Sequence, residues 1–172
     1  MTTPLTSDAG SPAVARVLVV EDSATQAAAL AMLLERAGFA TVLARRGDRA
    51  LELLESEEQI DLVLSDVVMP VMDGYELCRR IKANAAWQGI PVVLLTSLTD
   101  PLAIVRAVAS GADHYVTKPY DTEGLLSRVR FVLHHAKTPR IVTAAFEIEL
   151  LGTKFSIRAT KEQILELLVS SY

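Results

Sequence analysis

Polar side chains that could bind a metal ion or a phosphoryl group directly follow four short apolar segments of this chain: Glu21 and Asp22, Asp66, Thr96, and Lys118. Short continuous apolar runs are typical of parallel strands that are buried on both faces of a sheet. Because the ligands of open α/β sheets bind beyond the carboxyl ends of the strands, we expect these side chains to meet at one edge of one sheet. Carboxylates crowded together repel one another unless a cation joins them. The pattern therefore predicts a site for a divalent metal ion and a phosphoryl group.

The residue types also indicate how such a site would work. A carboxylate that accepts a phosphoryl group must approach an anionic donor, and phosphoryl transfer depends mostly on positioning and charge neutralisation. Mg²⁺ is usually held by one or two carboxylates, and Asp22 and Asp66 supply that pair, with Glu21 reaching the ion through water. Lys118 is a compact charge suited to one phosphoryl oxygen, and the Thr96 hydroxyl can donate to another. Taken singly, each residue has a structural alternative, such as capping a helix or closing a turn, so only the whole set indicates function.

Segments of alternating strand and helix character position these residues. Between Arg16 and about His135 this alternation occurs five times, with strand-like runs near 17–20, 41–44, 62–66, 91–96 and 114–117. Helices are expected over 24–37, 48–56 and 74–83, from Asp100-Pro101 to Gly111, and from Asp121 onward, because residues typical of helix starts and ends flank these segments. Strands that alternate with helices predict a doubly wound α/β fold, with a parallel sheet covered on both faces.

Over Arg16 to about His135 the chain resembles the receiver domain of the two-component response regulators. The resemblance rests on motifs that occur in this order: Glu21-Asp22, Asp66-Val67-Val68-Met69-Pro70-Val71-Met72-Asp73-Gly74, Thr96-Ser97, Tyr115, and Lys118-Pro119. It implies a flavodoxin-like sheet of five parallel strands in the order 2-1-3-4-5. It also implies a phosphorylation-dependent signalling module of a phosphorelay, which is a regulatory domain rather than an enzyme.

The resemblance further implies the ligands of the phosphoryl site. Asp66 is expected to accept a phosphoryl group from the phosphohistidine of a histidine kinase or a phosphotransfer protein. Mg²⁺ is expected to be bound by Glu21, Asp22, Asp66 and the backbone carbonyl of Val68, while Thr96 and Lys118 are expected to bind the phosphoryl group.

A switch and a special peptide bond are implied by the same resemblance. Tyr115 is expected to move inward when Thr96 engages the phosphoryl group, which would change the surface formed by the fourth helix, the fifth strand and the fifth helix. The peptide bond between Lys118 and Pro119 is expected to be cis. Val68 and Leu98 occupy two positions that vary in the family, and because both are apolar we expect slow loss of the phosphoryl group.

Two other functions are compatible with part of this pattern. Metal-dependent phosphohydrolases of similar architecture also use an aspartate nucleophile, but they usually need a second acid-base Asp two residues later, and here that position is Val68. A cap domain for a substrate is also missing. A receiver-like protein that only binds partners is the other alternative, and the intact set of carboxylates and Lys118 argues against it.

Composition narrows the class of protein. The chain has 172 residues, of which 51% are hydrophobic, and a formal net charge of −4. This composition suits one domain with an appendage, and the acidic balance argues against a nucleic-acid partner. No apolar run is long enough for a membrane span, and the single Cys78 is typical of a reducing cytoplasm. Residues 1–15 are rich in Thr, Ser, Pro and Gly and predict a disordered tail.

The pattern changes after the receiver-like segment, which we place at 16–135. A polar linker at 136–140 is expected to lead into an extension at 141–172, made of a β-hairpin and a helix that begins near Thr160. With Gly152-Thr153 as a two-residue turn, the predicted register places Leu150 opposite Phe155, Ile148 opposite Ile157, and Glu147 opposite Arg158.

The apolar hairpin face and the apolar helix stripe need a partner surface. We expect a homodimer through 141–172, and the alternative is that the extension folds back on its own receiver. The helix pattern still continues at Tyr172, so the chain is expected to be a piece of a longer protein, such as a receiver that precedes a histidine kinase.

Overall fold

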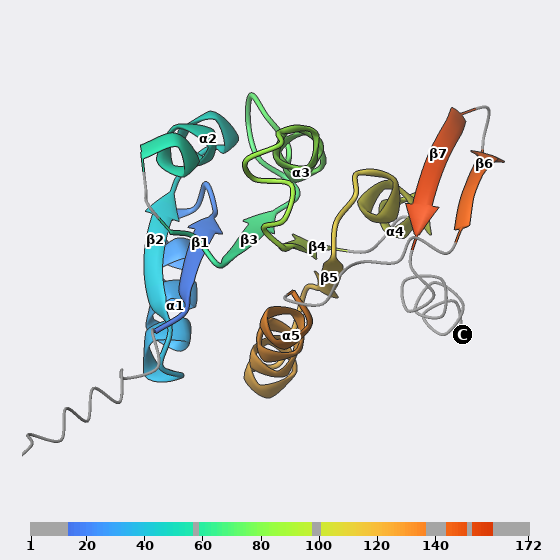
Figure 1. The fold of residues 1–172 in the computed structure, drawn as a ribbon. Coiled ribbons are helices and arrows are strands. Elements are labelled where there is room, and N and C mark those ends of the chain that lie inside the picture. The colour runs from blue at the N-terminus through green and yellow to red at the C-terminus, as the bar shows by residue number, and fades with distance from the viewer. Residues whose placement is uncertain (1–13, 57–58, 98–100, 137–143, 151–152, 160–172) are drawn as a thin grey trace, which may run out of the picture.

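The computed structural model describes residues 14–56, 59–97, 101–136, 144–150 and 153–159 (Figure 1). Strands and helices alternate through the receiver-like segment, and two further strands follow it. The elements are β1 (Arg16–Val20), α1 (Ala24–Arg36), β2 (Ala40–Ala44), α2 (Gly47–Ser56), β3 (Leu62–Asp66), α3 (Gly74–Ala83), β4 (Val92–Thr96), α4 (Pro101–Ala109), β5 (His114–Thr117), α5 (Thr122–His135), β6 (Ala144–Leu150) and β7 (Thr153–Ala159).

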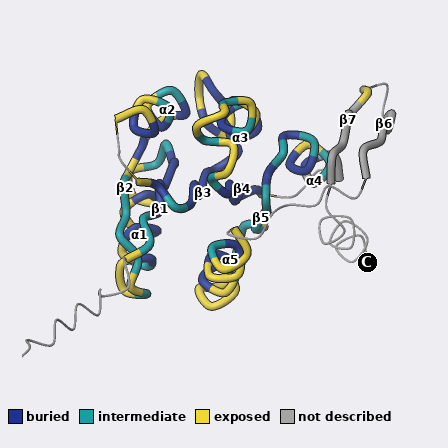
Figure 2. Tube along the Cα trace, viewed as in Figure 1, coloured by how far each residue is buried: buried dark blue, intermediate teal, exposed yellow. Residues whose placement is uncertain are grey.

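The main sheet has five strands in the order β2-β1-β3-β4-β5, and every pair of neighbours is parallel. The predicted fold class and strand order are therefore confirmed. Every residue of β3 and β4 is buried, as the dark central part of Figure 2 shows. A strand without an exposed face needs no alternation of apolar and polar residues, which explains the continuous apolar runs in the sequence.

Two separate cores cover the two faces of the sheet. On one face, alternate strand residues such as Leu18, Val63 and Leu94 pack with side chains of α2, α3 and α4. On the other face, their neighbours such as Val19 and Leu64 pack with α1 and α5. Figure 1 shows the same two layers of helices. Because a strand alternates its side chains between faces, each apolar strand supplies both cores at once.

The ends of the helices follow local signals that were predicted from the sequence. The Ser23 side chain accepts a hydrogen bond from the backbone N–H of Gln26, and the Asp121 side chain accepts one from Gly124. Gly38 and Gly111, which follow α1 and α4, have positive φ angles of 90° and 84°. This conformation favours glycine, because it lacks the Cβ that clashes there.

The hairpin forms, but the predicted register is wrong. Strands β6 and β7 are antiparallel, with Ile148 opposite Phe155, Phe146 opposite Ile157, and Glu149 opposite Lys154. The predicted and observed registers differ by two residues, so both keep the apolar residues on one face and the alternation cannot distinguish them. The observed pairing leaves residues 151–152 between the strands and pairs Glu149 with Lys154, in place of the predicted opposite-charge pair of Glu147 and Arg158.

The hairpin lies beside the receiver part of its own chain, where β7 runs against α4 (Figure 1). The helix expected from Thr160 and residues 1–13 of the tail expected over 1–15 lie outside the described residues.

Candidate functional site

Asp66 is the central residue of the predicted site. It ends β3 and is 9% exposed. Its Oδ1 atom accepts a hydrogen bond of 2.8 Å from the backbone N–H of Val67, and its Oδ2 atom lies 3.0 Å from Nζ of Lys118. One carboxylate oxygen is therefore held by the backbone, while the other faces a cation.

The loop after β1 brings two more carboxylates to Asp66. Glu21 is 1% exposed, and its Oε2 atom lies 3.3 Å from Nζ of Lys118. Its Oε1 atom accepts a hydrogen bond of 3.1 Å from the backbone N–H of Ser23. One oxygen each of Glu21, Asp22 and Asp66 lies within 4.8 Å of the others. A set of hard oxygen donors at this spacing fits Mg²⁺, which uses one or two carboxylates and keeps several waters.

Lys118 follows β5 and reaches the acidic residues at the same carboxyl edge of the sheet. Its backbone N–H donates to the carbonyl of Thr96 over 2.7 Å, so the ends of β4 and β5 are tied together. Although burial alone would lower the pKa of the Lys118 ammonium, the hydrogen bond and charge of Asp66, together with Glu21, raise this pKa above its usual value. The side chain is therefore a cation at neutral pH. The Lys118–Pro119 peptide bond is cis, the isomer that the resemblance implies.

Thr96 and Tyr115 lie on neighbouring strands and on the same face of the sheet. Thr96 is buried at the end of β4, two residues after Leu94. Leu94 pairs with Tyr115 of β5, and Tyr115 is partly buried against the core that contains Leu94. The structure thus brings Thr96 to the edge where Asp66 lies and places Tyr115 one step further from that edge.

The loop between β3 and α3 folds closely over Asp66. A Cβ atom placed on Gly74 would lie 2.4 Å from the carbonyl oxygen of Asp66, so only glycine fits. Met69 and Met72 are buried in the core and anchor the loop. Val68 is 70% exposed beside the site. Leu98, the other predicted apolar neighbour, lies outside the described residues.

Three residues at this edge were not found from the sequence. Arg45, which follows β2, donates from Nε to the carbonyl of Asp22 over 3.0 Å. Gln26 in the first turn of α1 accepts a hydrogen bond of 3.4 Å from Lys118 through Oε1. The pKa of the Tyr120 phenol is raised above its usual value, mainly by burial. The charge of Lys118 opposes this rise, and the charges of Glu21 and Asp66 add to it. Arg45 directly follows the end of β2, and Tyr120 directly follows the Lys118-Pro119 pair. The rule that ligands bind beyond the carboxyl ends of parallel strands could therefore have indicated both residues.

Comparison with known proteins agrees with this geometry. Residues 17–130 match the sequence model of the response regulator receiver domain. The chain belongs to this family. It is 40% identical over 150 residues to the DNA-binding response regulator MtrA of Mycolicibacterium paratuberculosis, which covers 87% of this chain and 65% of MtrA. It is 33% identical over 168 residues to the phosphate regulon transcriptional regulatory protein PhoB of Rhizobium meliloti, with 91% of this chain and 73% of PhoB covered.

Solved structures of receiver domains have a fold similar to that of this chain. The signal receiver domain of a signal transduction histidine kinase from Syntrophus aciditrophicus has a TM-score of 0.68 and 44% sequence identity, and the match covers 77% of this chain and all of that domain. The chemotaxis response regulator CheY4 of Vibrio cholerae has a TM-score of 0.64 and 31% identity, with 69% of this chain and 98% of CheY4 covered.

The match to MtrA leaves part of that protein uncovered, since this chain spans 65% of its length. Within the part of the chain that the structure describes, no helix combines the length and the apolar character that a membrane crossing requires.

Proposed function

We propose that Asp66 is the phosphoacceptor of this receiver domain and that it takes a phosphoryl group from a phosphohistidine on a histidine kinase or a phosphotransfer protein. The observation that carries the proposal is the position of the Asp66 carboxylate, 3.0 Å from Lys118 and within 4.8 Å of the oxygens of Glu21 and Asp22. A nucleophilic carboxylate with a fixed cation on one side and a cation site on the other is what phosphoryl transfer requires.

In the proposed reaction, Oδ2 of Asp66 attacks the phosphorus atom of the donor. The bond between phosphorus and the histidine nitrogen breaks, and the electron pair of that bond stays on the imidazole. The product is an acyl phosphate on Asp66. The backbone N–H of Val67 holds Oδ1 during the attack, and Lys118 exchanges its contact with Oδ2 for one with a phosphoryl oxygen.

Mg²⁺ is the proposed cofactor, and Glu21, Asp22, Asp66 and the backbone carbonyl of Val68 are the residues that would hold it. When bound, the ion neutralises the negative charge on the transferring phosphoryl group. Glu21 is nearly fully buried beside Lys118, so it also keeps the ammonium in place before the donor arrives.

The proposed switch begins at Thr96. Its hydroxyl would donate to a phosphoryl oxygen, and the partly buried ring of Tyr115 would then move inward along the same face of the sheet. This movement would alter the surface formed by α4, β5 and α5. The proposal describes a regulatory domain that assists only its own phosphorylation and dephosphorylation. The position two residues after Asp66 supports this, because Val68 has no proton to give and an aspartyl phosphohydrolase would need an acid there.

The partners and boundaries beyond this site are part of the proposal. The net charge of −4 supports a domain that does not itself bind nucleic acid, although MtrA is named as DNA-binding and the Syntrophus domain belongs to a histidine kinase. We propose a cytoplasmic protein with the receiver at 16–135, a linker at 136–140 and an extension at 141–172. The alternating apolar residues of the hairpin support a homodimer through that extension.

Intact-mass measurement after incubation with acetyl phosphate and Mg²⁺ tests the proposal. The wild-type protein should gain the mass of one phosphoryl group, and the Asp66→Ala protein or the wild type in excess EDTA should not. Asp48→Ala is the matched control, because Asp48 is an exposed aspartate that pairs with Arg46 outside the site. Equal labelling of the Asp66→Ala protein would exclude Asp66 as the acceptor.

A further inference from the structure

The short loop between β1 and α1 carries two of the proposed metal ligands, Glu21 and Asp22. The start of this loop is tied to β2, because the backbone N–H of Glu21 donates to the carbonyl of Ala44 over 3.0 Å. Its end is set by Ser23, which caps α1 and whose carbonyl accepts a hydrogen bond of 2.9 Å from the backbone N–H of Ala27. Asp22 lies between these two anchors, outside both the sheet and the helix. The orientation of Asp22 therefore depends on what else holds its peptide group.

Arg45 holds that peptide group through its guanidinium. The Nε atom donates to the carbonyl oxygen of Asp22 over 3.0 Å, and Nη2 donates to the same oxygen. Hydrogen bonds from a charged donor are stronger than those between neutral groups. Because the donors of a guanidinium form a rigid planar fork, two of them on one oxygen also fix the direction of the carbonyl, which a point charge would not do. Arg45 therefore sets the orientation of the peptide group that follows the Asp22 side chain.

The backbone of Arg45 is itself well placed to act as an anchor. The preceding residue, Ala44, ends β2 and pairs with Val20 of β1. Gly47, two residues after Arg45, begins α2 and is buried, and a Cβ atom there would lie 2.8 Å from Sδ of Met72. Arg45 thus lies between a strand pair and a close packing contact. Since ligands are held most precisely from rigid elements, Arg45 can hold the acidic loop in register with the sheet, while its own side chain stays exposed.

We propose that Arg45 is a positioning residue of the phosphoryl site, which keeps the Asp22 carboxylate turned toward Asp66. One oxygen each of Glu21, Asp22 and Asp66 lies within 4.8 Å of the others, and a loop that could rotate freely would let these like charges move apart before a cation binds. Arg45 holds the arrangement in advance, as outer-shell partners of metal ligands do. It acts through the Asp22 peptide group and contacts neither the ion nor the phosphoryl group. The inference rests on the proposed function, because it concerns the proposed Mg²⁺ site.

The charge of Arg45 and its hydrogen bonds affect Mg²⁺ binding in opposite directions, which makes the proposal testable. A cation near the site repels Mg²⁺, so the removal of an arginine that acted only through its charge would strengthen binding. The removal of an arginine that positions Asp22 would weaken it. Loss of an outer-shell partner typically lowers metal affinity by about 10- to 100-fold. Because Arg45 is exposed, we expect the lower end of that range.

Titration of the full isotope-labelled chain with Mg²⁺, followed by its NMR amide shifts, measures the affinity and shows in the same spectra that each variant is folded. Arg45→Ala and Arg45→Gln should raise the Kd for Mg²⁺ about tenfold. Arg45→Lys, which keeps the charge and can donate one hydrogen bond, should give a Kd between those of Arg45→Ala and the wild type. At saturating Mg²⁺ the rate of phosphorylation by acetyl phosphate should return close to the wild-type rate, because the variants lack only a positioning contact.

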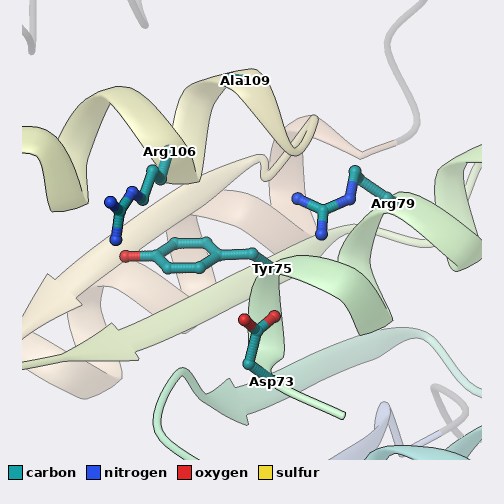
Figure 3. Close-up of a pocket in the computed structure, with 5 residues that line it drawn as sticks. All are labelled: Asp73, Tyr75, Arg79, Arg106 and Ala109. Atoms are coloured by element: carbon teal, nitrogen blue, oxygen red, sulfur yellow. The ribbon is translucent and has the colours of Figure 1, made fainter. Parts of the chain in front are cut away.

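Two other arginines are controls for the loss of charge. Arg46 is the neighbour of Arg45 but pairs with Asp48, and Arg106 lines a pocket between α3 and α4 (Figure 3). Arg46→Ala and Arg106→Ala should not raise the Kd for Mg²⁺. A Kd that is unchanged or lower in Arg45→Ala, or that rises as much in Arg46→Ala, would overturn the role of Arg45 and leave the proposed metal site standing. A wild-type protein that binds no Mg²⁺ would overturn the metal site itself, and the role of Arg45 with it.

Discussion

Replacement of Gly74 by alanine should damage both stability and phosphorylation, although the residue has no side chain and touches no ligand. A Cβ atom at this position would lie 2.4 Å from the carbonyl oxygen of Asp66 and 2.9 Å from the Cα atom of Val67. Both neighbours are backbone atoms, so no side-chain rotation can relieve the clash. The loop between β3 and α3 must instead move away from the end of β3, and Asp66 must move with it.

The size of the effect follows from two opposing contributions. Overpacking of a close contact costs about 1–3 kcal/mol, and a backbone clash belongs in the upper half of that range. Alanine at the first residue of a helix returns less than the roughly 1 kcal/mol that separates the helix propensities of alanine and glycine. We therefore expect Gly74→Ala to lower the free energy of unfolding by roughly 1–2 kcal/mol, which corresponds to a Tm about 4 °C lower for a chain of this length.

The effect on phosphorylation should be larger than the effect on folding. A displacement of a reacting group by about 1 Å can slow a reaction about 100-fold, so the rate of phosphorylation by acetyl phosphate should fall by roughly 10- to 100-fold. Thermal unfolding and timed intact-mass measurements give the two quantities on the same protein. Gly89→Ala is the matched control, because a Cβ atom there would meet nothing within 4 Å. If the two alanine variants behave alike, the close approach of Gly74 to Asp66 does not position the carboxylate.

Three further predictions concern Val71, His114 and Val68. Val71 has a φ of 71° and is 84% exposed. Val71→Gly should therefore stabilise the protein by roughly 0.5–1 kcal/mol in urea titrations, because it removes a valine from the left-handed region at the cost of some chain entropy. A less stable variant would contradict this. Burial, followed by the charge of Arg128, lowers the pKa of His114 to about 4. As the pH drops, the unfolded chain therefore binds a proton at His114 before the folded chain does, and the free energy of unfolding should fall by up to roughly 3 kcal/mol between about pH 6.5 and about pH 4. His114→Gln should flatten this pH dependence. An unchanged slope would refute the role of His114 in it. Val68→Asn should speed the loss of phosphate from Asp66, as followed by intact mass, because an amide can orient water and valine cannot; equal decay would remove the basis for slow hydrolysis in the wild type.

Much of this fold was predictable because its signals are local. The buried strands β3 and β4 are continuous apolar runs, and the caps at Ser23 and Asp121 are short-range hydrogen bonds that the sequence spells out. The meeting of Asp66 with Lys118 was also predictable, since a single topological rule brings the carboxyl ends of parallel strands together. No contact distance was needed for that inference.

The rest depends on distances that no pattern encodes. The hairpin register could not be chosen by alternation, because a shift of two residues leaves every side chain on the same face. The need for glycine at position 74 arises from the closeness of Asp66 in space, and the sequence indicated only a helix start there. Gln26 reaches the site from α1 through a side chain whose rotamer is set by tertiary packing.

The contact between α4 and β7 changes how the apolar extension should be interpreted. From the sequence alone, the exposed hairpin face favoured a dimer through 141–172. In the structure β7 already lies against α4, and Val108 is buried outside both receiver cores. The part of β7 that lies against α4 cannot contact a second copy at the same time. A dimer through that part of the hairpin would therefore require β7 to separate from α4.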